Sequence, residues 1–594
     1  MGYRGAVTEI PLWQQRFLAT RIQLPQFARY AEQRALYRSN ATGVEEIYLW
    51  DRSTDTHRQA TNRKNGTRSA LIAPDGEHFW WFNDTDGDEH GHWMRQHFAS
   101  GQANKALADV PDGYSAGLAL GRELVVVGVS NDDGSTLYAQ VNGKAHQIYQ
   151  HEQDAGVGDV SSDDTLIAIS HSEHGDSLHP DLRVLRADGS TVAELSDGPG
   201  KELYPAEFSP LLNDHRLLVN HERAGRTELL LWDPLSKDVR ELHIDLPGEI
   251  SGTWYPDASA LLVIAHHNAR STMHRYDLAD ETLTSIDTYP GIIEDAHVSP
   301  SGAVHYQWSN AEKPNQILEL GTGILLKPTG NIAPGSAPIE DHWVPGPGGD
   351  IHVLAAAPGP GTWPTIFSVH GGPHAADEDA FDAWRAAYLD SGYAVIQVNY
   401  RGSTGYGSAW RDAIIGKPGH TELADIAAVH QWAVDRGLAD PQRCVISGYS
   451  WGGYLTLLGL GTQPERWAAG VAGVPVADYL AAYEDEMEAL KAMDRVLFGG
   501  APHENPEPWL HASPIEYVTN VKAPVLILAG ANDSRCPLRQ IENYVSRLEE
   551  LNKPHEVFRF DAGHGSLVTA DRIRMVQAEL DFLAKHVAPR SVIG

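Results

Sequence analysis

The sequence predicts two domains, an N-terminal seven-bladed β-propeller and a C-terminal α/β domain with a doubly wound, mostly parallel sheet. Two observations lead to this prediction. A strand-rich unit recurs over residues 28–322, and apolar strands alternate with helices from residue 351 onward. The chain has 594 residues, which is too many for one core at about 100–200 residues per domain.

The repeated unit contains a turn, an apolar run, a polar loop and a second run that often ends in Trp-Asp or Tyr-Asp. Turns near positions 74, 163, 210, 256 and 300 recur about every 45 residues, and the first spacing is about twice that. The missing turn falls near residues 118–127, where only the apolar run remains. This period is typical of propeller blades, which bury their faces by stacking in a ring. We count seven blades, with six or eight blades and a two-sheet sandwich as alternatives.

Four segments follow from this pattern. Residues 1–27 precede the repeats, and we expect them to pack on the second domain. Residues 28–322 form the propeller. Residues 323–350 are rich in Pro and Gly and are expected to be a linker and the first segment of the second domain. Residues 351–594 form the rest of that domain.

The second domain is expected to alternate strands with helices. Between two strands, Leu423, Ile426 and His430 fall on one helical face, and Gly437 lies near the end of that helix. Such alternation indicates a parallel sheet whose reactive groups gather at the carboxyl ends of the strands. The expected strands cover residues 366–369, 394–398, 444–446, 525–528 and 557–560.

Residues 448–452, Gly-Tyr-Ser-Trp-Gly, fit the pattern G-x-S-x-G between an expected strand and an expected helix. A nucleophile elbow needs that context, because side chains at the glycine positions would collide within the sharp turn. A serine hydroxyl becomes a good nucleophile only when a base removes its proton. We therefore predict an α/β-hydrolase domain in which Ser450 is the nucleophile.

The base and its carboxylate partner are expected after two later strands. In this fold the chain order is serine, then Asp or Glu, then histidine. Asp533 follows the strand at 525–528 and His564 follows the strand at 557–560. We predict that His564 is the base and that Asp533 orients it. Asp561 is a rival carboxylate, but it is too close to His564 in sequence for the usual arrangement.

The oxyanion of a tetrahedral intermediate needs two preorganised N–H donors. The backbone N–H of Trp451, next to the serine, is the first expected donor. His-Gly-Gly-Pro at 370–373 follows a strand and is similar to the loop that supplies the second donor. Gly372 is the preferred donor and Gly371 is the second choice, with a plain glycine turn as the alternative.

The propeller repeats and five ordered motifs resemble the prolyl oligopeptidase family of serine peptidases, nearest its acylaminoacyl-peptidase and bacterial aminopeptidase branch. The resemblance covers essentially the whole chain. It implies a triad of Ser450, Asp533 and His564, oxyanion donors at Gly372 and Trp451, and a propeller that admits only short or unstructured peptides. The motifs are HGGP, NYRGSTGYG, GYSWGGY, GANDSRCP and DAGHG.

The resemblance also bears on substrate binding. It implies that Arg535 holds a substrate carbonyl and that Cys536 borders the S1 pocket, where a small buried filler is the alternative. Prolyl endopeptidases carry a tyrosine where His370 stands, so the resemblance does not imply strict cleavage after proline. Glu484 and Glu486 are candidates for binding a substrate ammonium, and an exposed acidic helix start is the alternative.

We expect no cofactor and no metal. Residues 84–89, Asp-Thr-Asp-Gly-Asp-Glu, have their glycine misplaced for a calcium loop and are read as a hairpin turn. A net charge of −33 would be repelled by phosphate backbones, which argues against nucleic acid as a partner. No apolar stretch approaches the about 20 residues needed to span a bilayer, so no membrane partner is expected.

The sequence therefore predicts a cytoplasmic serine peptidase that hydrolyses short peptides, and it leaves a homo-oligomer open. The cytoplasmic expectation rests on an N-terminus without the apolar core of a signal peptide. Two alternatives remain. The same scaffold serves an amidase or esterase acting on a small-molecule amide or ester, and a silent hydrolase domain would leave a propeller that only binds partners.

Overall fold

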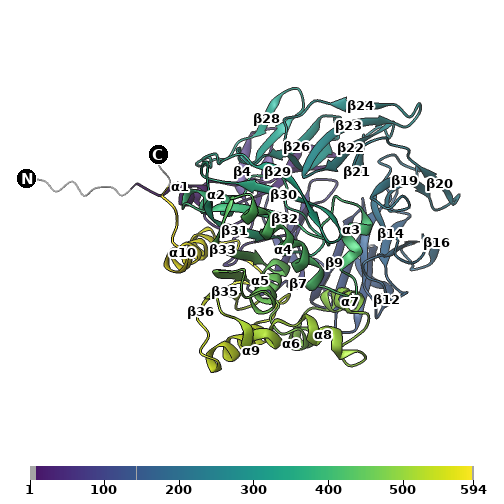
Figure 1. Ribbon diagram of the computed structural model, residues 1–594. Helices are drawn as coiled ribbons and strands as arrows, with labels where there is room; N and C mark the ends of the chain where they lie inside the picture. Colours follow the sequence, from purple (N-terminus) through teal and green to yellow (C-terminus); the bar gives the residue numbers. More distant parts are fainter. Residues whose placement is uncertain (1–8, 142, 592–594) are drawn as a thin grey trace, which may run out of the picture.

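The computed structural model describes residues 9–141 and 143–591, which form a strand-rich domain and an α/β domain (Figure 1). The strand-rich domain consists of seven four-stranded antiparallel units in chain order. The first three contain β1 (Gln26–Ala28), β2 (Ala31–Ser39), β3 (Glu46–Asp51), β4 (Thr56–Gln59), β5 (Ala70–Ile72), β6 (His78–Asp84), β7 (His90–His97), β8 (Ala103–Lys105), β9 (Gly113–Leu120), β10 (Val125–Asn131), β11 (Gly134–Val141) and β12 (Lys144–His151). The other four contain β13 (Ala155–Val160), β14 (Ile167–His171), β15 (Asp181–Leu185), β16 (Thr191–Leu195), β17 (Leu203–Phe208), β18 (Leu217–His221), β19 (Glu228–Asp233), β20 (Asp238–Glu241), β21 (Glu249–Trp254), β22 (Ala260–His267), β23 (Arg270–Asp277), β24 (Leu283–Ile286), β25 (Ile292–Val298), β26 (Val304–Ser309), β27 (Gln316–Glu319) and β28 (Gly323–Leu326).

These units form the predicted seven-bladed propeller. The ring closes where the first blade meets the last, with the ring of Phe27 in β1 centred 5.1 Å from that of His305 in β26. Strand β7 pairs with β9 as well as with β6, so the second and third blades share one eight-stranded sheet. Each blade buries apolar side chains against its neighbours, as a propeller requires.

The degenerate turn in the sequence pattern belongs to the third blade, where β9 is followed by β10. The backbone N–H groups of Arg122, Glu123 and Leu124 donate to the carboxylate of Asp164, at 2.9, 2.6 and 3.1 Å. Asp164 belongs to the turn of the next blade. The third blade therefore needs no aspartate in its own turn, which is why the repeat is not visible there.

The α/β domain has an eight-stranded sheet with the order β29-β30-β32-β31-β33-β34-β35-β36. The pairs β29–β30 and β30–β32 are antiparallel and all others are parallel. Its strands are β29 (Glu340–Gly346), β30 (Gly349–Ala356), β31 (Trp363–Val369), β32 (Ala394–Asn399), β33 (Ala439–Tyr449), β34 (Ala469–Gly473), β35 (Val525–Gly530) and β36 (His555–Phe560). The helices are α1 (Leu12–Leu18), α2 (Ala383–Asp390), α3 (Ser408–Arg411), α4 (His420–Asp435), α5 (Trp451–Thr462), α6 (Tyr479–Asp485), α7 (Glu488–Phe498), α8 (Pro506–Ala512), α9 (Leu538–Glu550) and α10 (Thr569–His586), with 3-10 turns η1 (Asp412–Ile414) and η2 (Pro514–Asn520).

Helices cover both faces of this sheet, as predicted for a doubly wound fold. One apolar core joins the sheet to α4, α5 and α9, and another joins it to α1, α2 and α10. The last three helices lie together at the left of Figure 1. Among residues 9–141 and 143–591, no helix is both long and apolar enough to cross a membrane.

The N-terminal helix α1 packs on the α/β domain. Phe17 is fully buried, its ring lies 4.8 Å from that of Trp384 in α2, and Arg16 forms an ion pair with Asp390 of the same helix. The predicted propeller end at residue 322 is four residues short, because β28 pairs with β27 in the last blade. The glycines at 321 and 323 form a hairpin turn rather than the start of a linker.

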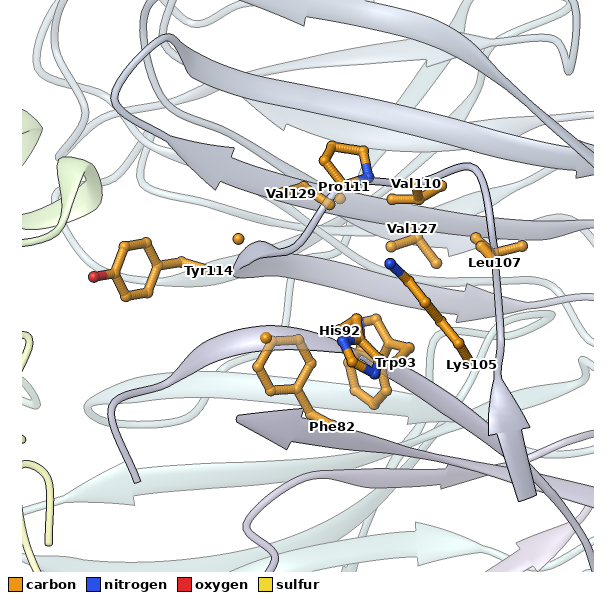
Figure 2. Close-up of a pocket in the computed structure, with 13 residues that line it drawn as sticks. Phe82, His92, Trp93, Lys105, Leu107, Val110, Pro111, Tyr114, Val127 and Val129 are labelled. Carbon is orange, nitrogen blue, oxygen red and sulfur yellow. The ribbon is translucent and has the colours of Figure 1, made fainter. Parts of the chain in front are cut away.

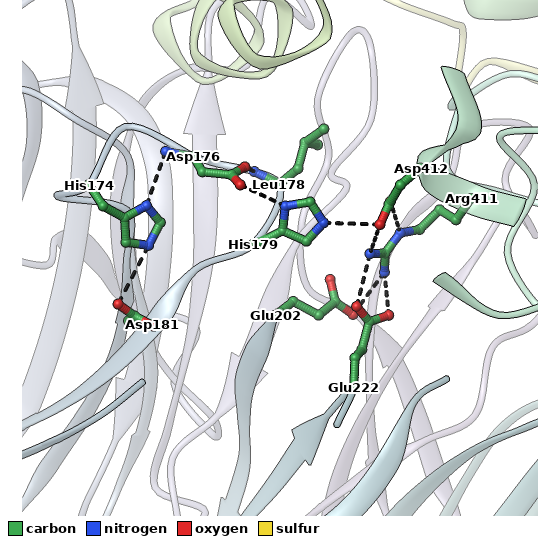
Figure 3. Close-up of polar contacts among 9 residues, drawn as sticks. All are labelled: His174, Asp176, Leu178, His179, Asp181, Glu202, Glu222, Arg411 and Asp412. Carbon is green, nitrogen blue, oxygen red and sulfur yellow. Dashed lines mark hydrogen bonds and ion pairs between the residues drawn. The ribbon is translucent and has the colours of Figure 1, made fainter. Parts of the chain in front are cut away.

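Ion pairs join the two domains at the end of α3 (Figure 3). Arg411 donates to both carboxylate oxygens of Glu222 in the propeller, at 2.5 and 2.9 Å. His179, also in the propeller, lies 2.8 Å from Asp176 and 3.1 Å from Asp412. These contacts hold the α/β domain against the propeller.

Candidate active site

Ser450 occupies a strained turn between β33 and α5. Its backbone has φ 57° and ψ −120°, a conformation that a non-glycine residue rarely adopts. Two backbone hydrogen bonds stabilise this turn: the Ser450 N–H donates to the Gly473 carbonyl at 2.8 Å, and the Tyr454 N–H donates to the Ser450 carbonyl at 2.9 Å. The strand–turn–helix geometry is that of a nucleophile elbow.

The glycines of the motif are required by packing. A Cβ atom on Gly448 would lie 2.3 Å from the carbonyl oxygen of Val369, and one on Gly452 would lie 2.0 Å from the same atom. Both separations are far below van der Waals contact with a backbone atom that cannot rotate away. The turn therefore depends on glycine at both positions.

The imidazole of His564 lies against the carboxylate of Asp533. Nδ1 is 2.9 Å from Oδ2 and 3.0 Å from Oδ1. The Asp533 side chain is fully buried, and its Oδ1 also accepts hydrogen bonds from the backbone N–H groups of Arg535 and Cys536, both at 2.9 Å. These donors fix the carboxylate, which accepts a hydrogen bond from Nδ1 of His564 and leaves Nε2 as the unprotonated ring nitrogen of the neutral imidazole.

Asp561, the rival carboxylate, does not contact this imidazole. Its side chain is 68% exposed and pairs with Lys64 of the propeller at 2.7 Å. Within the described residues, neither the Ser450 hydroxyl nor Nε2 of His564 has a hydrogen-bond partner. Triad hydrogen bonds are often long in unliganded enzymes and tighten when substrate binds.

The glycine loop after β31 lies against the elbow. A Cβ atom on Gly371 would be 3.4 Å from Cβ of Ser450 and 4.0 Å from the backbone N of Trp451. His370 Nδ1 lies 2.8 Å from the Gly371 carbonyl oxygen and donates to it. Because N–H and C=O point in opposite directions across a trans peptide, this bond turns the Gly372 N–H to the other side of the loop.

Arg535 is held by the propeller. Its guanidinium donates to both carboxylate oxygens of Glu89 at 2.8 and 2.7 Å. Glu89 ends the predicted hairpin turn between β6 and β7, and Asn65 donates to the Asp86 carbonyl of the same turn at 2.7 Å. Sequence reasoning missed Glu89 as a partner, because an acidic residue in a hairpin turn carries no signal of a contact with another domain.

Glu484 and Glu486, two residues apart in sequence, have different surroundings. Glu484 is exposed and forms an ion pair with Arg539 at 2.7 Å, so it lies outside the site. Glu486 is buried, beyond the end of α6. The Cys536 thiol is buried too, and burial raises its pKa well above the usual range. This burial is compatible with both predictions for Cys536, a residue that borders the S1 pocket and a small side chain that fills the core.

Among the residues that the structure describes, one group of side chains offers ligand atoms close enough to hold a metal. Atoms of Asp533, Cys536 and His564 all lie within 4.8 Å of one another. Nδ1 of His564 is already bonded to Asp533, and burial keeps the Cys536 thiol protonated, whereas metals bind the thiolate. The donor set therefore fits a triad better than a metal site.

Two cavities near β6 and β9 differ in what they can hold. A cavity of about 10 Å³ inside the propeller, lined by Phe82, Trp93 and Val127, has room for about one water (Figure 2). A cavity of about 370 Å³ lies between the domains, with Glu89 and Arg535 in its wall. Since Arg535 is two residues from Asp533, the larger cavity is the one beside the predicted triad.

A propeller joined to a sheet of this order, with its elbow serine at the edge facing the ring, defines a two-domain protein of the α/β-hydrolase class. Residues 379–590 match the model of the prolyl oligopeptidase family.

Curated relatives are similar in sequence to this chain over part of their own length. Dipeptidyl aminopeptidase BIII of Pseudoxanthomonas mexicana is 27% identical over 57% of this chain and 47% of its own length. The acylamino-acid-releasing enzyme of Arabidopsis thaliana is 32% identical over 33% of this chain and 27% of its own length. The match therefore spans less than half of either relative.

Solved structures resemble the whole chain in fold. A puromycin-hydrolyzing peptidase of Mycobacterium tuberculosis has a TM-score of 0.80 at 18% identity, over 98% of this chain and 96% of that chain. The acylaminoacyl peptidase of Pyrococcus horikoshii has a TM-score of 0.72 at 15% identity, over 98% of both chains.

Proposed function

We propose that this protein is a serine peptidase that hydrolyses short peptides through an acyl-enzyme. The observation that carries the proposal is the pairing of His564 with the buried Asp533 at 2.9 Å, on the sheet edge that presents the strained Ser450. The family match and the peptidase names of the curated relatives support a peptide as the substrate.

In this mechanism, Ser450 Oγ attacks the carbonyl carbon of the scissile bond while its proton passes to Nε2 of His564. Asp533 stabilises the resulting imidazolium. The N–H groups of Trp451 and Gly372 hold the oxyanion. Collapse of the intermediate breaks the C–N bond, and the imidazolium gives its proton to the leaving amine. Water then attacks the acyl-serine by the same route and releases the acid.

The test is Ser450→Ala, assayed with matched anilide, ester and peptide substrates. Loss of the nucleophile should reduce kcat/KM about 10³-fold or more, because the triad acts as a unit. Thermal unfolding of the variant should stay near that of the wild type. Labelling with a fluorophosphonate should be confined to Ser450 and absent from the variant.

The outcomes separate this proposal from its rivals. Peptide hydrolysis that persists in purified Ser450→Ala rejects the nucleophile. A wild type that cleaves esters but no peptide or anilide is an esterase. A wild type that neither turns over any substrate nor reacts with the fluorophosphonate has a silent hydrolase domain, and the propeller is then its working part.

A further inference from the structure

A completely buried carboxyl group lies behind the nucleophile elbow, on Glu579 of α10. Its carboxylate accepts hydrogen bonds from the Tyr388 hydroxyl at 2.5 Å, from the Tyr449 hydroxyl and from the Trp384 indole N–H at 3.4 Å. All three donors are neutral side chains. Burial raises the pKa of Glu579, and the three hydrogen bonds oppose that shift.

Packing alone does not account for a carboxyl group at this place. An apolar side chain of similar size would fill the same space without needing a donor, and replacing buried polar groups by well-packed apolar ones is often neutral or stabilising. A fully bonded polar group instead fixes the side chains that it joins in one arrangement. What Glu579 adds to this core is a fixed geometry for the three side chains that donate to it.

One of these three side chains belongs to the elbow itself. Tyr449 directly precedes Ser450, and its ring lies over Gly473, since a Cβ atom on that glycine would be 2.3 Å from Cδ1 of the ring. The carbonyl of the same glycine accepts the Ser450 N–H at 2.8 Å. Gly473 therefore holds the ring of Tyr449, and Glu579 holds its hydroxyl. Because both ends of the tyrosine are fixed, the adjoining backbone of Ser450 has little room to move.

The other two donors anchor the carboxylate to α2. Trp384 and Tyr388 lie one turn apart in that helix. Tyr388 is buried, and the Trp384 ring packs on that of Phe17 in α1 with centres 4.8 Å apart. Glu579 therefore joins the elbow to a core that is built from three helices, α1, α2 and α10.

The helix that carries Glu579 also follows the predicted base. Helix α10 begins at Thr569, shortly after His564, and the Thr569 N–H donates to the Gly43 carbonyl of the propeller at 2.8 Å. The same helix therefore fixes the chain after His564 at its start and the elbow further along. The Ser450 hydroxyl and Nε2 of His564 must meet when substrate binds, so the reaction depends on how firmly each is placed.

We propose that Glu579 is a positioning residue for the nucleophile, which holds Ser450 in place through the hydroxyl of Tyr449. The inference rests on the proposed function and extends it to a residue outside the three that react. Because Glu579 is completely buried, it cannot touch substrate. Loss of its bond to the elbow should therefore lower the rate of the chemical step and leave substrate affinity nearly unchanged.

The experiment uses the full chain and compares Tyr449→Phe with Tyr393→Phe. The first substitution removes only the hydroxyl that joins the elbow to Glu579. The second is the matched control, because the buried Tyr393 hydroxyl donates to the carbonyl of Val587, the residue that ends α10, at 2.8 Å. Each variant loses one hydrogen bond to the same helix, so a purely structural role would give the same result in both.

Tyr449→Phe should lower kcat on one anilide about 10- to 100-fold and leave KM within about twofold, because a small displacement of the nucleophile costs that much in rate. Tyr393→Phe should keep both kcat and KM within about twofold of wild type. The midpoints of thermal unfolding should shift by similar amounts in the two variants. A wild-type kcat in Tyr449→Phe overturns the proposal, as does an equal loss of kcat in the control.

Glu579→Gln tests the carboxyl group itself. Glutamine offers one acceptor oxygen in place of two, so the hydroxyls of Tyr388 and Tyr449 can no longer donate to separate oxygens. The kcat should fall by a factor similar to that of Tyr449→Phe, and the double variant should fall no further, since both changes remove the same bond. Losses that multiply in the double variant overturn the proposal. If Glu579→Gln fails to fold in thermal unfolding, the two tyrosine variants decide.

The rate of fluorophosphonate labelling separates this inference from the proposed function. Labelling needs an activated Ser450 but no peptide substrate. Labelling that is about 10-fold or more slower in Tyr449→Phe than in wild type supports the positioning role even if no peptide is cleaved. Peptide hydrolysis by wild type, with labelling and kcat unchanged in Tyr449→Phe, supports the peptidase and rejects the positioning role. A wild type that does not label has no active nucleophile to position, which rejects both.

Discussion

His370 shows how one side chain prepares the predicted oxyanion hole. Its ring stacks on Tyr400 with centres 4.2 Å apart, and the Tyr400 hydroxyl donates to the His370 carbonyl at 2.8 Å. Burial lowers the pKa of His370 to about 4, so the ring is neutral at physiological pH. Nε2 lies 2.8 Å from the Ser403 hydroxyl, which itself donates to the Tyr400 carbonyl at 2.7 Å. In the proposed mechanism, the histidine acts through the loop and is a positioning residue.

We expect His370→Ala to lower kcat about 10- to 100-fold with little change in KM, because the loop donor would no longer be held where the oxyanion forms. His370→Asn is the matched variant, since its amide nitrogen can replace Nδ1 and should restore much of kcat. Steady-state kinetics on one anilide measure both. An unchanged kcat in the alanine variant would remove His370 from the mechanism.

At the scale of elements, the elbow between β33 and α5 is the segment of the candidate site that least tolerates substitution. The neighbouring loops bring Asp533 after β35 and His564 after β36 to the same sheet edge. The propeller hairpin between β6 and β7 packs closely against the loop after β36. A Cβ atom on Gly563 in that loop would lie 1.9 Å from the Gly87 carbonyl oxygen of the hairpin. The site is therefore assembled from elements of both domains.

Gly448→Ala should destabilise the protein by about 1–3 kcal/mol and abolish activity, because the added methyl meets a backbone carbonyl at 2.3 Å. Gly459→Ala in α5 is the control. Its methyl would meet side-chain carbons of Leu423 and Ile446 at 3.1 and 3.2 Å, which can move, and alanine favours the helix. Chemical denaturation compares the two, and equal stability in both variants would refute the argument.

At the scale of the whole molecule, the ion-pair network in Figure 3 couples the two domains to pH. Burial lowers the pKa of His179, but its bonds to Asp176 and Asp412 outweigh burial and raise that pKa to about 9. Burial raises the pKa of the nearby Glu202 to about 7. Both folded-state pKa values exceed their unfolded values, so each contribution is full below the unfolded pKa and is lost as pH rises through the folded one.

The contact between domains should therefore weaken as pH rises, through Glu202 between about pH 4.5 and 7 and through His179 between about pH 6.5 and 9. We expect His179→Gln to lower the unfolding free energy by about 1–3 kcal/mol at neutral pH and to flatten the loss of stability toward pH 9. His174→Gln, a half-exposed neighbour 3.5 Å from Asp181, is the control and should change little. Thermal unfolding from pH 6 to 10 decides, and parallel curves for wild type and His179→Gln would contradict this role.

Much of the candidate site could be predicted from the sequence, because its residues belong to local sequence patterns. The elbow at 448–452 depends on glycines that any sharp strand–helix turn requires, and the positions of Asp533 and His564 follow from strands that end just before them. Glu579 had no such pattern. It is one of many acidic residues in surface-like helical sequence, and only its burial distinguishes it.

The amino-acid order by itself determined the seven blades, the doubly wound sheet and the order of the predicted triad, because these depend on periodicity and on turns between adjacent elements. Contacts between segments far apart in the chain were decided only by the tertiary structure. These include the pairing of Arg535 with Glu89, the exposure of Glu484 against the burial of Glu486, and the assignment of residues 323–326 to the last blade. Burial and ion pairing depend on which distant surfaces meet, and no local pattern of residues specifies that.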